Sequence, residues 1–169
     1  TYLHEKFGFS LARSGFDATF YHYLAAFFGV LLGASIADKY CRKVTGMRGL
    51  VQACGLLLGA PFIFLLGVGN SPWFIYMSLA IFGLFRGIYD SNIFAALYDV
   101  VEPRVRSTAT GLMLMFAFVT GASAPYILGK IKPLLGLSWG LSALSVVYIF
   151  SAVCILIAVR FFYKKDIIE

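Results

Sequence analysis

The chain has 169 residues, of which 60% are hydrophobic and only 13% are charged, and its mean hydropathy is +0.85. Soluble domains carry about a quarter charged residues, so this composition excludes an ordinary soluble domain and indicates a membrane protein. The net charge of +6 does not indicate nucleic-acid binding, because the basic residues form short clusters between apolar runs and no basic face interleaved with aromatic residues. The three cysteines lack the spacing of metal ligands or of a disulfide framework, so neither a metal site nor a cofactor is expected.

Residues 1–17 are mixed, amphipathic and aromatic, and they are expected to form an extracytoplasmic connector ahead of a transmembrane bundle over residues 18–162. The chain does not begin with Met, so we expect it to be a fragment of a longer protein. The first span is expected at about 16–37, because roughly 20 apolar residues cross a hydrocarbon core about 30 Å thick. Its Gly29 and Gly33 lie four residues apart, which lets a neighbouring helix approach closely.

The next uncharged run, 49–85, is too long for a single crossing. An Asn-Ser-Pro sequence at 70–72 lies near its middle, and Pro with small polar residues breaks a helix. The run therefore divides into a second span at about 48–68 and a third at about 72–98.

A charged turn follows the third span, and two further uncharged stretches predict a fourth span at about 107–129 and a fifth at about 137–162. A short loop at 130–136 joins them, and residues 163–169 form a charged tail. The expected fold class is an all-α membrane protein with five transmembrane helices. Such a chain contacts the lipid bilayer along most of its length.

The orientation follows from the distribution of Lys and Arg, which concentrate on the cytoplasmic side of membrane proteins. One side of the predicted bundle has nine such residues, namely Lys39, Arg42, Lys43, Arg48, Arg104, Arg106, Arg160, Lys164 and Lys165. The other side has four, namely Lys6, Arg13, Lys130 and Lys132. We therefore expect an integral protein of the plasma (inner) membrane with a cytoplasmic C-terminus.

The turn after the first span, G-A-S-I-A-D-K-Y-C-R-K at 33–43, resembles the G-x-x-x-D-(R/K)-x-G-R-(R/K) loop of major facilitator superfamily transporters. It departs from that pattern at Ala34 and Cys41, where the family usually has Gly. In that family the loop joins the second and third helices of each six-helix half. Here it follows the first span, so the chain resembles a half without its first helix.

Two further stretches carry the same resemblance. The stretch E-P-R-V-R-S-T-A-T-G at 102–111 resembles the family's cytoplasmic turn between helices ten and eleven, although it is one residue shorter before its arginine. Gly121, Pro125 and Gly129 resemble the Gly/Pro pattern of the following helix. The resemblance implies helices eight to twelve of the C-terminal half, with the N-terminal helix bundle as the missing partner.

The charged turns are candidate gating loops in this resemblance. The residues concerned are Asp38, Lys39, Arg42 and Lys43 in the first turn and Glu102, Arg104 and Arg106 in the second. Asp38, at a helix end, is expected to accept hydrogen bonds from Arg42 or from a neighbouring helix N-terminus, as a latch that closes the cytoplasmic side. The alternatives are that the charges of the first turn only set the topology and that those of the second form a solvated turn.

Arg86 and Asp90 are formal charges inside the otherwise apolar third span. An arginine at mid-bilayer costs about 2.5 to 3.5 kcal/mol to insert, so it should face the protein interior with a partner. Residues four apart on a helix lie about 40° apart around its axis, which places Asp90 beside Arg86, and Tyr89 shares the same face. Either the pair only packs the bundle, or Arg86 attracts an anionic substrate while Asp90 and Tyr89 tune it or pass a proton. His22, between two tyrosines, is either an interfacial residue or a proton-coupling group.

The predicted function is part of a secondary active transporter, for example a symporter, which moves a small-molecule substrate by alternating access and has no enzymatic activity. The substrate is expected to be an organic anion or a sugar derivative because of Arg86. No ATP-binding loop of the G-x-x-x-x-G-K-(S/T) type occurs, so a gradient would supply the energy. The alternatives are a transport-inactive membrane fragment and an intramembrane enzyme, although the sequence has neither G-x-S-x-G nor H-E-x-x-H.

Overall fold

The computed structural model describes residues 2–163, except for the side chains of residues 2, 131, 132, 134, 135 and 137. Within that part of the chain the fold is built from helices alone, which confirms the expected all-α class. The elements in order are α1 (Tyr2–Phe7), α2 (Leu11–Tyr40), α3 (Met47–Val68), α4 (Pro72–Asp90), α5 (Ile93–Val100), η1 (Pro103–Val105), α6 (Arg106–Ala158) and η2 (Val159–Tyr163). Apart from Tyr163, the expected tail 163–169 lies outside the described residues.

Five stretches of the described chain are helical, long and apolar enough to cross a membrane, as the fold prediction required. They are Leu11–Tyr40, Met47–Val68, Pro72–Val100, Pro103–Lys130 and Ser138–Tyr163. The first begins at Leu11, inside the segment expected as a connector, because the side chain of Ser10 accepts a hydrogen bond from the backbone N–H of Arg13 and caps the helix.

The third span, expected at about 72–98, is built from two helices, α4 and α5. The break falls at Ser91 and Asn92, between α4 and α5. The Ser91 hydroxyl donates to the Ile88 carbonyl oxygen at 2.8 Å, and the Asn92 amide donates to the Gly33 carbonyl oxygen on α2 at 3.3 Å. These side chains bond to backbone groups and compete with regular helical hydrogen bonding, which favours a break.

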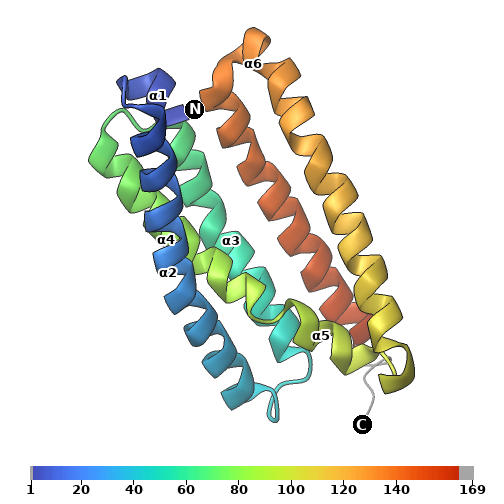
Figure 1. The fold of residues 1–169 in the computed structure, drawn as a ribbon. Coiled ribbons are helices and arrows are strands. Elements are labelled where there is room, and N and C mark those ends of the chain that lie inside the picture. Colours follow the sequence, from blue (N-terminus) through green and yellow to red (C-terminus); the bar gives the residue numbers. More distant parts are fainter. Residues whose placement is uncertain (1, 164–169) are drawn as a thin grey trace.

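The last long helix, α6, folds back on itself and supplies the fourth and fifth spans (Figure 1). The reversal occurs at Gly136, whose φ of 77° lies in the left-handed region that favours glycine. The expected loop at 130–136 is therefore largely helical, and one residue provides most of the turn. The two halves run antiparallel over the length of the bundle.

Glycine residues hold α2, α3 and α4 close together. A methyl group on Gly29 or Gly87 would overlap the backbone of the facing helix, Leu84 and Ala26 respectively. On the other side of α4, a methyl group on Gly55 of α3 would lie 2.8 Å from the Phe85 carbonyl oxygen. Small residues of this kind let membrane helices pack backbone to backbone. As a result α4 is fixed between α2 and α3, and α3 also packs against α6.

The two ends of the bundle differ in charge. Figure 1 places α1, the loop between α3 and α4, and the bend of α6 at one end, and the two charged turns with the end of the last helix at the other. The fourth span, Pro103–Lys130, packs loosely, and no residue in its apolar window is buried within the described chain. Lipid or further helices must cover that surface.

Candidate functional site

Arg86 lies at the sequence midpoint of the third span, and its Nε is 3.4 Å from the Asp90 carboxylate one turn later on α4. The two side chains are 48% and 39% exposed within the described chain. A guanidinium has five N–H donors, and Asp90 with the nearby Tyr148 leaves some of them available. The pair is therefore accessible, partly neutralised and able to accept a further anionic partner.

Aromatic side chains from two other helices surround this pair. The imidazole of His22 on α2 stacks on the ring of Phe82, with centroids 5.4 Å apart, and Phe82 in turn contacts Tyr148 of α6 at 5.5 Å. Tyr148 and His22 both lie within electrostatic range of Arg86 and Asp90. The structure thus brings α2, α4 and α6 together around the charges in the middle of the third span.

Tyr89, expected on the same face as the pair, lies where α4 meets α3. Its backbone N–H and Cβ lie over Gly55 of α3, where an added methyl group would be 2.9 Å and 3.2 Å from them. Tyr89 is still close enough to Asp90 to interact electrostatically. It therefore flanks the charge pair from the α3 side, while Tyr148 flanks it from α6.

A second polar group lies at the charged end of the bundle. Arg48 on α3 donates a hydrogen bond to one carboxylate oxygen of Asp99 on α5, and the hydroxyl of Tyr163 in η2 donates to the other. A more distant Arg48 nitrogen lies 3.9 Å from Asp38, whose side chain is 74% exposed. Asp38 thus lies nearer to Arg48, in the first turn of the neighbouring helix α3, than to Arg42; both Arg42 and a neighbouring helix N-terminus were considered as its partners.

The other predicted gating residues lie around this group. Arg106 donates to the Tyr98 carbonyl oxygen at 2.8 Å and to that of Val101 at 3.2 Å, and so closes the end of α5. The remaining five are exposed and have no carboxylate or cationic partner within 4 Å in residues 2–163, namely Lys39, Arg42, Lys43, Glu102 and Arg104. These five contribute charge to the surface and make no fixed ion pair there.

Sequence reasoning did not identify Asp99, Tyr163 or Tyr148 as site residues. Arg48 was counted among the basic residues of the cytoplasmic side, and the third span was expected to end before Asp99, but no local pattern pairs residues 51 positions apart. A polar pair at the opposite end was also missed, where the Tyr76 hydroxyl donates to Asp17 at 2.6 Å. Only helix packing brings these groups together.

A metal centre finds no support in the described chain. Among residues 2–163 no group of three or more His, Cys, Asp or Glu side chains is placed to hold a metal ion. The cysteines, Cys41, Cys54 and Cys154, are free thiols far apart in sequence.

Comparison with known proteins identifies the family of the chain. The family model described as Major Facilitator Superfamily matches residues 1–167. Protein spinster homolog 3 from Homo sapiens is 33% identical over 111 residues, which is 63% of this chain and 22% of the relative. The Mus musculus protein of the same name is 32% identical over 110 residues, covering 63% of this chain and 21% of the relative. The chain therefore spans about a fifth of the length of the curated relatives it matches, and no solved structure matches it.

Proposed function

Because this chain belongs to the Major Facilitator Superfamily, we propose that it forms part of a secondary active transporter, which carries a small solute across the membrane by alternating access. In this mechanism two helix bundles rock around a central site. The five spans correspond to helices eight to twelve of the C-terminal half, and the partner is the N-terminal helix bundle. Family membership favours this role over the intramembrane enzyme considered as an alternative.

The substrate site is centred on Arg86, with Asp90 and Tyr89 beside it. The observation that carries this assignment is an accessible charge pair at the midpoint of an apolar span. Ionisable residues at that depth are costly to keep, and they commonly mark solute pathways. The substrate is an organic anion or a sugar derivative, recognised by the free donors of Arg86. Asp90 and the neighbouring His22 provide groups for coupling to protons in a symporter.

The charged end acts as the gate. Its surface is formed by the charged residues of the two turns, namely Asp38, Lys39, Arg42, Lys43, Glu102, Arg104 and Arg106. Arg48 and Asp99 form a fixed ion pair beneath that surface, which supports a latch that makes and breaks during the transport cycle. This end carries most of the Lys and Arg residues, so it faces the cytoplasm of the plasma (inner) membrane, with the C-terminus on the same side.

The test is transport by the longer protein that contains this chain, reconstituted in liposomes and supplied with a panel of lactate, gluconate and glucose 6-phosphate. Arg86→Lys keeps the charge but loses the planar, forked donor geometry. We expect uptake of the preferred anion to fall at least about tenfold in that variant, equivalent to one lost charged hydrogen bond. Lys130→Gln, at the opposite end of the bundle, is the matched control and should retain uptake. Unchanged uptake by Arg86→Lys would exclude Arg86 from substrate recognition.

A transport-inactive fragment is the second candidate for the chain alone. It is favoured by the fourth span, which has no buried residue in its apolar window within the described chain and so encloses no pathway by itself. Residues 1–169 and the longer protein are reconstituted in separate liposomes, and uptake by the two is compared to separate the two roles. Uptake by the longer protein alone assigns transport to the assembled bundles, whereas uptake by neither would remove the transporter proposal.

A further inference from the structure

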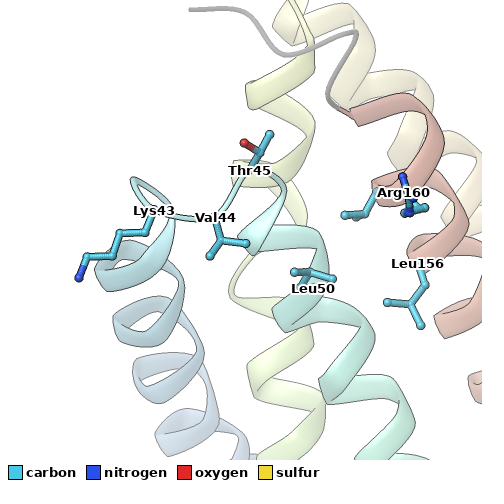
Figure 2. Close-up of a pocket in the computed structure, with 7 residues that line it drawn as sticks. Lys43, Val44, Thr45, Leu50, Leu156 and Arg160 are labelled. Carbon is cyan, nitrogen blue, oxygen red and sulfur yellow. The ribbon is translucent and has the colours of Figure 1, made fainter.

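An open cleft lies at the charged end of the bundle, between the start of α3 and the last turns of the fifth span. Its volume is about 710 Å³. Lys43 and Thr45 border it on the side of the turn before α3, and Arg160 borders it on the side of the last helix (Figure 2). Figure 2 shows the Lys43 side chain directed away from Leu50 and Arg160, toward the outer side of the turn. Arg160 therefore provides the positive charge at the cleft, and the exposed Lys43 side chain lies at its rim.

The floor of the cleft is apolar and firmly held. Leu50 from α3 and Leu156 from α6 lie on its two sides, with Val159 beside them. An added methyl group on Gly46 would come within 2.8 Å of one Val159 methyl carbon, and one on Gly49 would come within 2.5 Å of the other. This close contact fixes the last helix against α3. Arg160, the next residue, is thereby held at the edge of the cleft.

The two cations at the border form no ion pair with the described part of the chain. Neither Lys43 nor Arg160 has a carboxylate within 4 Å among the described residues 2–163. Arg160 instead lies over the ring of Phe161, with its guanidinium carbon 5.9 Å from the centroid. The cleft thus presents positive charge beside apolar side chains, with no carboxylate among residues 2–163 to offset it.

We propose that this cleft binds an anionic glycerophospholipid, with Arg160 contacting its phosphate and Leu50 and Leu156 contacting the first part of an acyl chain. The exposed Lys43 side chain rotates toward the cleft and adds a second cation when the lipid is bound. Basic pockets between transmembrane helices on the cytoplasmic side bind anionic headgroups in this way. An inorganic phosphate ion would use the charges but not the apolar floor. Exposed apolar residues on the same helix, Phe161 and Phe162, indicate that the cleft opens toward lipid. The site is separate from the proposed substrate site at Arg86.

The experiment measures lipid binding to the longer protein in detergent by native mass spectrometry, with phosphatidylglycerol as the anionic probe. Phosphatidylcholine tests the requirement for net negative charge, and inorganic phosphate tests whether the headgroup anion alone suffices. We expect phosphatidylglycerol to bind at least about tenfold more tightly than phosphatidylcholine, and the Lys43→Gln/Arg160→Gln double variant to lose that preference. Lys130→Gln, which removes a cation at the opposite end, should bind as the parent does.

Three results would overturn the proposal: equal binding of the two lipids, unchanged phosphatidylglycerol binding in the double variant, or displacement of the lipid by equimolar inorganic phosphate. A second variant covers the case in which the double variant fails to fold. Thr45→Trp adds bulk at the exposed mouth of the cleft and keeps both cations. It should weaken phosphatidylglycerol binding at least about fivefold by obstruction, and parental binding in this folded variant would also reject the site.

Discussion

Arg48 on α3 donates a hydrogen bond to the carboxylate of Asp99 on α5, although the two residues are 51 positions apart in the chain. Their side chains are only 26% and 24% exposed, so water screens the pair weakly. Tyr163 donates to the same carboxylate from η2. One acidic side chain thus connects the second, third and fifth spans at the charged end of the bundle.

Removal of either partner of this pair should destabilise the fold. Asp99→Asn leaves the Arg48 guanidinium partly buried without its anion, and we expect a loss of about 1 to 3 kcal/mol in the free energy of unfolding. Thermal unfolding in detergent measures the change. The exchanged pair Arg48→Asp/Asp99→Arg should recover part of the loss, and equal stability of Asp99→Asn and the parent would contradict the structural role of the pair.

Tyr163→Phe tests the third member of the group. The variant keeps the ring and removes only the hydroxyl that donates to Asp99, so a loss of about 1 kcal/mol is expected. Hydrogen exchange should show faster opening of the last turn of the fifth span. Tyr126→Phe serves as the control, because Tyr126 is 65% exposed and its change should leave exchange in that turn unaltered.

Asp38→Asn should separate gating from stability. Asp38 is 74% exposed and 3.9 Å from Arg48, and exposed pairs of this kind contribute about 0 to 1 kcal/mol. We therefore expect a nearly unchanged melting temperature, together with impaired uptake by the longer protein if Asp38 belongs to the latch. Parental uptake rates would leave Asp38 as a topology determinant only.

The glycine contacts between α2 and α4 predict a sharp difference between two glycine substitutions. Gly87→Ala places a methyl group on the carbonyl of Ala26 and forces the two helices apart, at a cost of about 1 to 3 kcal/mol. Gly15→Ala on α2 meets nothing within 4 Å in the described chain and should be neutral or slightly stabilising. Chemical denaturation of both variants measures the difference. Similar stabilities would show that α2 and α4 can move apart with little loss of stability.

Asp90→Asn tests whether Arg86 needs its neighbour. The variant leaves a positive charge at the middle of the third span without the carboxylate at 3.4 Å, and we expect lower thermal stability and lower yield in the membrane. Adding Arg86→Gln removes the unpaired charge and should restore stability toward that of the parent. A double variant less stable than Asp90→Asn alone would show that Arg86 is held by other partners, such as Tyr148.

The sequence by itself determined the all-α class, the number of spans and the presence of a charge pair at Arg86 and Asp90. Hydropathy and charge are sums over neighbouring residues, and residues four apart on a helix are neighbours in any fold. The family resemblance of the turn at 33–43 was also readable without a structure, and the family is confirmed.

Only the tertiary structure decided which helix each side chain meets. The pairing of Arg48 with Asp99, the approach of Tyr148 to Arg86 and the break at Asn92 depend on how closely α2, α3 and α4 cross. That distance is set by backbone contacts at glycines on facing helices, and a single chain position carries no information about its partner across the crossing. Local pattern therefore identifies what enters the membrane, whereas helix packing selects the contacts made there.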